Sequence, residues 1–301
     1  MRAHLAAALA LLAAGQVYGQ ALYTRDAARD PGARSWAIER AALPPFEAPK
    51  TADGHPDLRG RWAGTPGGDD LEEHEYRDIS SPPEESFLAD PPDGKLPYQP
   101  WALEVRARIR AGLGRGWPGE TERLYTDPQT FCLYSVPRAT YRGGFELVQE
   151  RDAVLIVYGF GHYYRLIPTD GRAHGVGPAV KMWMGNSVGR WDGNALVVDV
   201  TSLNGRNWLD QSGNFFSDRA HVTERFALAS PSIIDYQVTI DDPSVFTRPW
   251  TIRLPIRRAR VDGGDRYASE TWENACHEGN QSGDDSRALG FQWFRGVSPP
   301  K

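Results

Sequence analysis

Residues 273–280 (ENACHEGN) place a thiol, an imidazole, two carboxylates and two amides within eight positions. Such groups serve in nucleophilic catalysis, metal binding and acid–base catalysis. Cys276 and His277 are adjacent, which gives poor geometry for a nucleophile and its base. On a strand, His277 and Glu278 point to opposite faces and do not easily reach one ion. We expect Cys276 to anchor this segment and to hold His277, a candidate catalytic residue, at a fixed position.

The anchor predicted for Cys276 is a disulfide with Cys132, the one other cysteine of the chain. An even cysteine count in an exported protein favours a disulfide. The enclosed loop of about 140 residues gives roughly 4–5 kcal/mol of stabilisation in the chain-entropy model. Two buried free thiols are the alternative.

A second candidate group lies on residues 220–226 (AHVTERF). A period of two places Glu224 on the apolar face of a strand and His221 on the other face. Burial raises the pKa of an unpaired carboxyl, which suits a general acid or base. The alternative is that Glu224 forms an ion pair with an arginine of a neighbouring strand.

Aromatic and polar residues near these positions are candidate ligand contacts. On residues 161–167 (GHYYRLI), His162 and Tyr164 share one face, and both faces mix polar and apolar groups. A barrel interior that binds a small molecule has this character, and an amphipathic barrel wall is the alternative. His174 and the pair Trp208 and Asp210 lie in connections that could cover a barrel mouth. The predicted catalytic residues are His162, His221, Glu224 and His277. The predicted ligand contacts are Tyr164, His174, Trp183, Trp208 and Asp210.

The sequence lacks the motifs that are typical of several other kinds of active site. The chain has no His-x-His, His-x-x-x-His or Cys-x-x-Cys spacing, so no metal site is predicted, and a metal held by dispersed histidines is the alternative. Residues 185–189 (GNSVG) match the nucleophile elbow of serine hydrolases, but a hairpin follows where that motif needs a helix. No phosphate-binding glycine loop occurs, and no cofactor is predicted.

The elements that must position these residues are mainly strands. Alternating or continuous apolar runs predict strands at 145–150, 153–160, 163–167, 187–191, 195–201, 221–227, 233–240, 250–256 and 267–272. Short turn-forming stretches such as Asp192-Gly-Asn194 join several of them as hairpins. The predicted fold class is all-β and mainly antiparallel: a closed or nearly closed barrel of the lipocalin type, or a sandwich.

One helix is predicted, at residues 98–113, because Pro100 stands near its start and Gly112 and Gly114 follow its end. Residues 1–20 have the layout of a signal peptide, and an N-terminal buried helix is the alternative. Residues 21–97 are rich in proline and turn residues and predict an irregular arm that packs on the core. Residues 98–301 then form a single β-rich domain.

Composition limits the partners. The net charge is −5 and the pI about 5.8, and no Lys/Arg stripe stands out, which argues against nucleic acid and against anionic membrane surfaces. No later run is long and apolar enough to span a bilayer. Ten tryptophans suit both strand packing and small-molecule pockets. The expected location is the periplasm or outside the cell.

Residues 53–62 (DGHPDLRGRW), 187–193 (SVGRWDG) and 276–280 (CHEGN) carry a resemblance to known sequences. With them, the chain resembles a large group of exported bacterial proteins that have no assigned activity. Further matching positions are Asp127, Pro128, Cys132, Pro137, Arg138, Gly185, Leu196, Val197, Val198, Asp199, Ser217, His221, Glu224, Arg225, Asp241, Asp242, Pro243, Pro249 and Trp250. The resemblance covers most of the chain and implies one exported β-rich unit, without implying a reaction.

Three functions follow as hypotheses. The first is a protein that binds a small organic molecule in an aromatic pocket and acts on it by acid–base chemistry, as a lyase, isomerase or hydrolase. The second is a periplasmic binding or accessory protein without catalysis. The third is a metalloenzyme that uses dispersed histidines.

Overall fold

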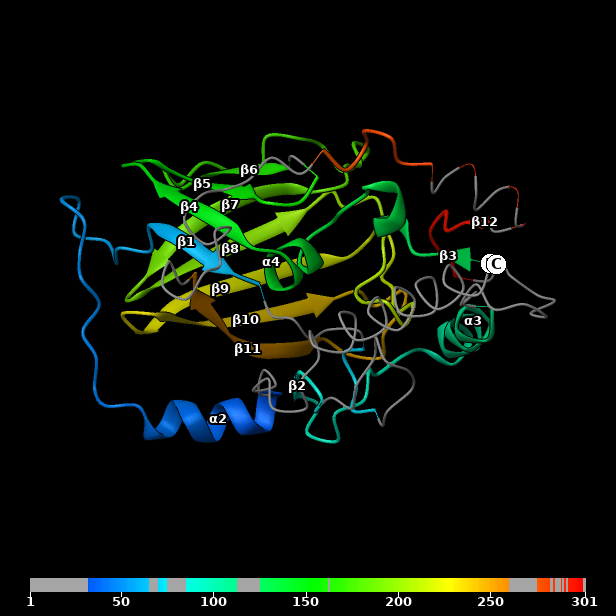
Figure 1. The fold of residues 1–301 in the computed structure, drawn as a ribbon, viewed down its shortest axis with the longest axis horizontal. Helices are drawn as coiled ribbons and strands as arrows, with labels where there is room; N and C mark the ends of the chain where they lie inside the picture. Colours follow the sequence, from blue (N-terminus) through cyan, green and yellow to red (C-terminus); the bar gives the residue numbers. More distant parts are fainter. Residues whose placement is uncertain are drawn as a thin grey trace, which may run out of the picture. The chain divides into compact units, whose positions relative to one another are not determined.

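The protein is described from a computed structural model that covers residues 32–64, 70–74, 85–112, 125–161, 163–259 and 275–281, with 284, 288, 290 and 292–299. Ten strands of this part of the chain form one sheet (Figure 1). They are β1 (Gly60–Ala63), β2 (Leu88–Asp90), β4 (Phe145–Gln149), β5 (Ala153–Tyr158), β6 (Tyr164–Pro168), β7 (Asn186–Asp192), β8 (Ala195–Thr201), β9 (His221–Ser230), β10 (Ile233–Asp241) and β11 (Trp250–Arg258).

The sheet curls into a nearly closed barrel. Its strand order is β6-β5-β4-β1-β11-β10-β9-β8-β7, all neighbours are antiparallel, and β2 pairs with β11. The end strands β6 and β7 meet through side chains, because Arg165 donates to Ser187 Oγ at 2.9 Å. A Cβ on Gly189 would lie 2.9 Å from Ile167 Cγ2. The predicted all-β, nearly closed antiparallel barrel is therefore confirmed.

The strands form where the sequence alternates. In β9, Val222, Glu224 and Phe226 are buried on the inner face, whereas His221 is exposed on the outer face. Tight turns set the register. Gly193 and Asn194 join β7 to β8 after the pair Asp192 and Ala195, and Gly193 has the positive φ of +57° that such a turn requires.

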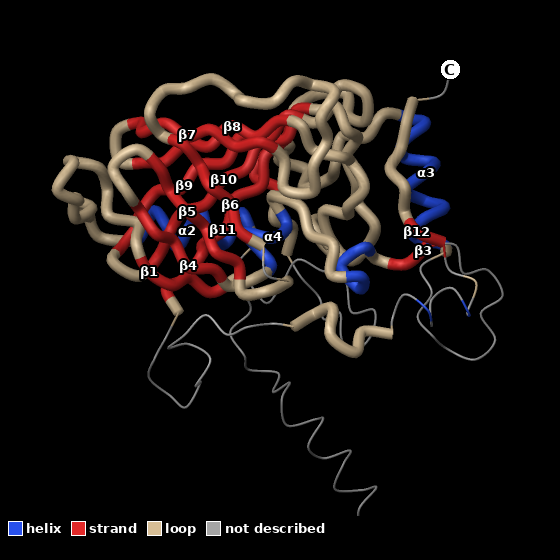
Figure 2. The backbone as a smooth tube through the Cα atoms, turned by 90° about the horizontal axis from the view of Figure 1, so that it is seen from above, coloured by secondary structure: helices blue, strands red, loops and turns tan. Residues whose placement is uncertain are grey.

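Three α-helices occur among the described residues: α2 (Ala33–Ala42), α3 (Pro100–Ala111) and α4 (Arg138–Arg142). Helix α3 confirms the predicted helix, with Pro100 in its first turn and Gly112 at its end. A two-stranded parallel sheet of β3 (Tyr125–Thr126) and β12 (Gln292–Trp293) lies near α3, away from the large sheet (Figure 2). None of the described helices has the length and apolar character needed to cross a membrane.

The segment 21–97, predicted to be an irregular arm, contains regular structure. Strand β1 lies within the sheet between β4 and β11, and α2 runs alongside β11 (Figure 1). The side chain of Trp36 is fully buried against Ala229 and Ile233, and its Nε1 donates to Asp235 Oδ1 at 2.9 Å. The prediction of an irregular arm is wrong in this respect, because long-range pairing and tryptophan burial override the local proline and glycine content. The predicted signal peptide 1–20 and strand 267–272 lie outside the described residues.

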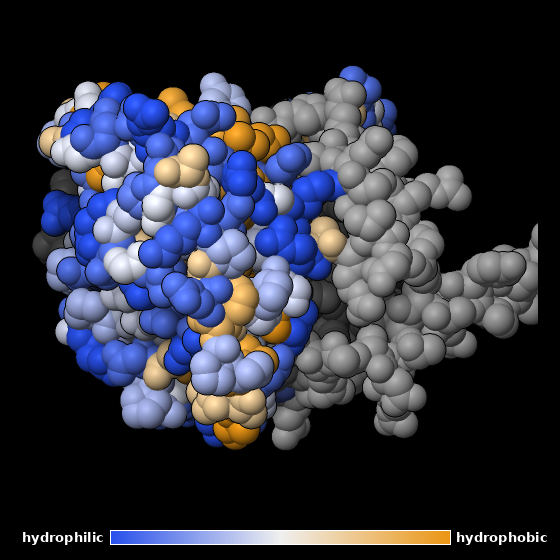
Figure 3. Space-filling view, turned by 90° about the vertical axis from the view of Figure 1, so that its left-hand side faces the viewer, coloured by the Kyte–Doolittle hydropathy of each residue, from blue (hydrophilic) through white to orange (hydrophobic). Residues whose placement is uncertain are grey.

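The interior of the barrel is packed with apolar and aromatic side chains. Fully buried members of this core include Trp62, Tyr236, Phe226 and Trp250. Rings meet at tilted angles, as in the pair Phe226 and Tyr236, whose centroids are 4.8 Å apart. The side of the molecule at the left in Figure 1 has a mostly hydrophilic surface with small separate hydrophobic groups (Figure 3).

Candidate functional site

Two histidines share one carboxylate on the outer face of the barrel. The Nε2 atom of His174 lies 2.6 Å from Asp199 Oδ2, and the Nε2 atom of His221 lies 2.5 Å from Asp199 Oδ1. The other ring nitrogen of His174, Nδ1, lies 2.7 Å from Asn186 Oδ1. We call these four residues the His–Asp–His cluster.

Three neighbouring strands and one long connection position the cluster. Asn186 begins β7, Asp199 lies near the end of β8, and His221 begins β9. His174 lies in the connection 169–185 between β6 and β7. The end strands β6 and β7 run parallel to each other at the seam, the place where the barrel closes. The connection must therefore return along the barrel from one end to the other. His174 thus fixes the middle of this connection to the sheet.

The carboxylate of Asp199 is held in its charged form. Burial raises its pKa, but the hydrogen bonds from His174 and His221 outweigh that effect, and the pKa lies below its usual range. The His221 side chain is 45% exposed, and the His174 side chain is 23% exposed. An ionised carboxylate is thus surrounded by two imidazoles, one of which faces solvent.

This geometry suits proton transfer. A carboxylate bound to one ring nitrogen fixes the tautomer of the imidazole and stabilises its protonated form. With Nε2 of His221 committed to Asp199, its Nδ1 is the nitrogen that can exchange a proton with a bound molecule.

Glu224 lies on the opposite face of β9 from His221 and belongs to a different network inside the barrel. Its Oε2 accepts from Arg165 Nη2 at 2.6 Å, and its Oε1 accepts from Tyr236 at 2.6 Å and from Thr140 at 3.2 Å. The Glu224 side chain is fully buried, and Arg165 is 4% exposed. Of the two alternatives for Glu224, the structure contains the ion pair with an arginine.

The interior network keeps Arg165 charged and the tyrosines around it neutral. Burial lowers the pKa of Arg165, but the Glu224 carboxylate outweighs that effect and raises it. Burial raises the pKa of Tyr158 and, together with the Glu224 charge, raises that of Tyr236. Both oxygens of Glu224 already accept hydrogen bonds, so this carboxylate is occupied by structural contacts. The structure does not bring Glu224 and His221 into one site.

The predicted contacts on β6 have different positions from those expected. Tyr164 is 68% exposed on the outer face, whereas Arg165 and Ile167 face the interior. The expected inward direction of Tyr164 is therefore wrong, because the alternation on β6 has the opposite phase. His162 lies outside the described residues. Trp183 is half-buried in the connection that also carries His174.

Trp208 and Asp210 are buried and belong neither to the His–Asp–His cluster nor to the Glu224 network. Trp208 is 1% exposed and packs its ring on Phe294, so it is not an open wall for a ligand. Asp210 is fully buried and accepts from the backbone N–H groups of Leu71, at 2.9 Å, and Ser212, at 3.0 Å. Neither side chain presents an open surface to a ligand, and their role at the barrel opening stays a prediction.

Asp210 stands beside a second buried carboxylate. Asn214 Nδ2 donates to Asp210 and also, at 3.2 Å, to Asp70 Oδ1. Arg110 donates to Asp70 Oδ2 at 2.8 Å. Burial, and then the charge of Asp70, raise the pKa of Asp210 to about 6. Asp70 lies within residues 21–97, which the sequence predicts to be an irregular arm that packs on the core.

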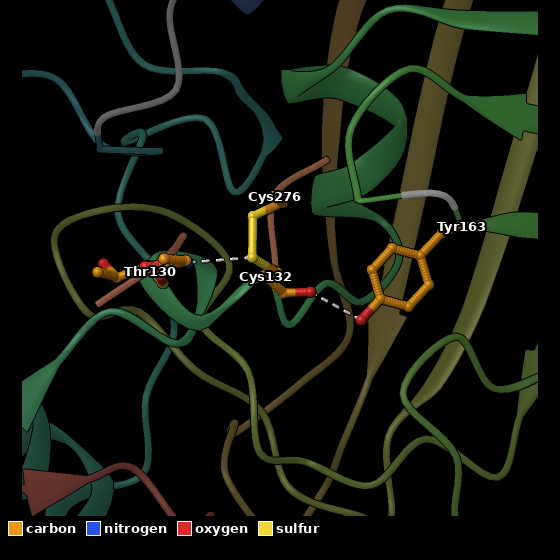
Figure 4. The surroundings of a disulfide bond; sticks show 5 residues. Thr130, Cys132, Tyr163 and Cys276 are labelled. Carbon is orange, nitrogen blue, oxygen red and sulfur yellow. Dashed lines mark hydrogen bonds between the residues drawn. A yellow bond between two sulfur atoms is a disulfide. The ribbon is translucent and has the colours of Figure 1, made fainter. Parts of the chain in front are cut away.

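The disulfide between Cys132 and Cys276 is confirmed, with the two Cα atoms 5.8 Å apart (Figure 4). Tyr163 donates to the carbonyl of Cys132 at 2.8 Å, and Asn280 Nδ2 donates to the carbonyl of Thr130 at 3.1 Å. His277 is exposed in the turn after Cys276. The disulfide anchors the turn, but His277 is not part of the His–Asp–His cluster.

Two further chemistries can be judged from the described residues. No group of three or more His, Cys, Asp or Glu side chains in this part of the chain is arranged to hold a metal ion. Ser187, from the serine-hydrolase pattern, is 5% exposed on β7 and accepts a hydrogen bond from Arg165. A strand, not a strand–turn–helix elbow, holds this serine.

Comparisons with known proteins add no assignment. No model of a known protein family matches the chain, and no curated protein matches it. Asp199 and Asn186 were not among the predicted site residues. Asp199 is one of the positions that carry the sequence resemblance, and it interrupts an apolar strand (ALVVDVT).

Proposed function

We propose that the protein binds a small organic molecule and moves a proton on it through His221. The observation that carries this proposal is the pair of hydrogen bonds from His174 and His221 to the two oxygens of Asp199. Asp199 orients the imidazole of His221, and the half-exposed ring presents Nδ1 to the ligand. The reaction class is a lyase, isomerase or hydrolase reaction that needs one general base.

The surroundings of His221 offer a place for such a molecule. Lys181 Nζ donates to the carbonyl of Asp218, three residues before His221, and Met182 N donates to Ser202 O at 2.8 Å. These bonds hold the end of the connection 169–185 next to the start of β9. Trp183, which follows directly, supplies an aromatic surface for the ligand. The aromatic-rich barrel supports small-molecule binding in general.

The test is the hydrolysis of ethyl dichloroacetate, an ester with a poor leaving group, for which an imidazole acts as a general base. The imidazole takes a proton from the water that attacks the carbonyl and returns it to the departing ethoxide. We expect His221→Gln to lower the rate to the uncatalysed background, since general-base catalysis contributes about 10²–10⁴-fold. Asp199→Asn should lower it by a smaller factor. His277→Gln, which alters an exposed histidine outside the cluster, should leave the rate unchanged. Equal rates for wild-type and His221→Gln protein would refute the assignment.

The second candidate is a binding protein without catalysis. It is favoured by His174, whose two ring nitrogens are both within hydrogen-bonding distance of oxygen acceptors, as in a structural clamp. A thermal-shift screen with sugars, aromatic compounds and terpenoid-like compounds identifies ligands of either candidate. A ligand that raises the melting temperature and is recovered chemically unchanged after incubation with the protein supports the second candidate.

We also propose export to the periplasm or the medium. The disulfide supports this location, because disulfides persist in oxidising compartments. Residues 1–20 have the composition of a signal peptide. N-terminal sequencing of protein recovered from the periplasmic fraction should find a start near residue 20. Full-length protein confined to the cytoplasm would contradict the proposal.

A further inference from the structure

The two imidazoles bound to Asp199 have different surroundings. Both Nε2 atoms face a carboxylate oxygen, at 2.6 Å for His174 and at 2.5 Å for His221. The Nδ1 atom of His174 faces a further oxygen, Asn186 Oδ1, at 2.7 Å. The Nδ1 atom of His221 has no hydrogen-bond partner among the described residues. The two rings therefore differ in the hydrogens that they must carry.

The partners of His174 determine where its hydrogens lie. A carboxylate and an amide oxygen only accept hydrogen bonds, so the ring nitrogen that faces each of them must donate. Burial raises the pKa of Asp199, but the hydrogen bonds from the two histidines outweigh it, so this carboxyl is ionised. His174 then needs one hydrogen on Nε2 and another on Nδ1. An imidazole with two N–H groups is a cation.

His221 needs only one hydrogen. Its Nε2 donates to Asp199 Oδ1 and its Nδ1 meets no acceptor, so a neutral ring with a lone pair on Nδ1 satisfies every contact. The His221 side chain is 45% exposed, against 23% for His174. The positive charge thus suits the ring that two acceptors enclose, and the ring that is more open to solvent can stay neutral.

We propose that Asn186 keeps His174 as a cation and that this cation keeps His221 neutral, the state that a general base needs. The inference rests on the proposed function and adds two positioning residues, Asn186 and His174, which act on His221 through Asp199. One imidazolium neutralises the carboxylate. A second proton, on His221, would place two cations around one anion, and the repulsion between them opposes it.

The other charged groups around His221 do not replace His174. Asp241 on β10 lies opposite His221 in the register and is exposed. Arg219 is exposed two residues before His221, and Lys181, in the connection 169–185, donates to a backbone carbonyl. Among the described residues, the ion pairs of Asp199 are those with the two histidines. The charge on Asp199 is therefore balanced by the imidazoles.

The charge of His174 can be measured from the ¹⁵N resonances of its ring. The full chain is labelled with ¹⁵N in its histidines and studied at neutral pH, and the His174 signals are assigned by their loss in His174→Ala. The two nitrogens of an imidazolium are chemically alike and resonate close together, whereas those of a neutral ring are widely separated. We expect a close pair of signals for His174 and a separated pair for His221.

Two variants of Asn186 test its part in this arrangement. Asn186→Asp offers only acceptors, so the hydrogen bond from His174 Nδ1 persists and the His174 signals should stay close together. Asn186→Leu offers no acceptor, so the His174 signals should separate as the ring loses a hydrogen. Asn194→Asp makes the first change in the exposed turn at the other end of the β7–β8 hairpin. It should leave the His174 signals as they are in the wild type.

The pH dependence of ethyl dichloroacetate hydrolysis is the second measurement. In Asn186→Leu and in His174→Ala, the positive charge on Asp199 must come from His221, and a protonated His221 is not a base. The acidic limb of the pH–rate profile should therefore move to higher pH. On that limb we expect a rate about three- to tenfold below wild type, as loss of one nearby charge predicts. Asn194→Asp should keep the wild-type profile.

Failure of this inference and failure of the proposed function give different results. If His221→Gln hydrolyses the ester as fast as the wild type, the proposed function is wrong. If His221→Gln is inactive, the inference alone is overturned by widely separated His174 signals in the wild type or in Asn186→Asp. It is also overturned if the acidic limb stays in place in both Asn186→Leu and His174→Ala.

Discussion

Arg165 on β6 and Glu224 on β9 form an ion pair of 2.6 Å across the inside of the barrel. The two strands are not neighbours in the sheet, so the pair connects β6, on one side of the closing seam, to β9, which β8 and β7 separate from the seam. Arg165 also donates to Ser187 of β7 at 2.9 Å. One guanidinium thus joins both strands of the seam to a buried carboxylate.

Replacing Arg165 with Met should destabilise the fold strongly. The variant leaves the Glu224 carboxylate buried without its cation, which costs about 3–5 kcal/mol of unfolding free energy. Urea denaturation followed by tryptophan fluorescence measures the change. The control is Arg172→Met, which breaks an exposed ion pair with Asp170 and should change stability little.

A second variant separates loss of the pair from loss of packing. In Arg165→Met with Glu224→Gln, the remaining side chain is neutral and still accepts a hydrogen bond from Tyr236. We expect the double variant to recover a substantial part of the lost stability. If both variants are equally unstable, the ion pair is not the source of the effect.

Sequence patterns alone predict much of the barrel, because its hairpins are local. The strands from β4 to β11 follow from alternation and tight turns, and Ile233 directly follows the turn after Ser230. β1 and β2 span four and three residues among prolines and glycines, and their pairing is non-local. No local pattern can indicate that Trp62 pairs between β4 and β11.

The candidate site is less predictable for the same reason. Period two correctly separates His221 from Glu224 on β9, and a loop histidine at 174 is visible in the sequence. Both imidazoles meet at Asp199 because the connection 169–185 returns along the barrel. No local pattern indicates that path. The phase of β6 places Arg165 rather than Tyr164 inward, where Arg165 pairs with Glu224 from a strand far away in the sequence, and this pairing has no local signal.

Replacing Asp199 with Asn should loosen the connection 169–185. The change removes the charge that accepts hydrogen bonds from His174 and His221, and because the cluster is partly exposed we expect a loss of about 1 kcal/mol. Hydrogen exchange of residues 169–185 should become faster, as measured by mass spectrometry. Asp241→Asn alters the exposed neighbour of His221 on β10 and should leave that exchange unchanged. An unchanged rate in Asp199→Asn would mean that other contacts hold the connection.

Acid should also release this cluster. The pKa of Asp199 is lowered in the folded protein, so its stabilising effect is complete above the ordinary pKa of an aspartate and is lost as the pH falls through the lowered value. A ¹³C NMR titration of the carboxyl groups measures the pKa directly. His174→Ala with His221→Ala should raise the Asp199 pKa, because burial then acts without the two hydrogen bonds. A pKa that stays low in this variant would assign the effect to another group.

Loss of the disulfide should destabilise the protein and free the turn after Cys276. The bond closes a loop with a sequence separation of 144, for which the chain-entropy model gives about 4–5 kcal/mol. Cys132→Ser with Cys276→Ser should lower the melting temperature, and calorimetry measures the difference. Treatment of the wild type with a reductant should reproduce it. A melting temperature that neither change affects would show that packing alone holds the segment.

Asp210 should make the protein less stable as the pH rises. Its pKa is raised to about 6 in the folded state, first by burial and then by the Asp70 charge. A raised carboxyl pKa means that the folded state binds more protons, so the unfolding free energy falls as the pH rises from about 4 to about 6. The full shift corresponds to about 3 kcal/mol.

Asp70→Asn keeps an acceptor for the backbone N–H of Glu72 and removes the neighbouring charge, so the fall in unfolding free energy should become smaller. Urea denaturation of both proteins across this pH range tests the prediction, with Asp241→Asn as the exposed control. Identical pH profiles for wild-type and Asp70→Asn protein would show that Asp70 does not influence Asp210.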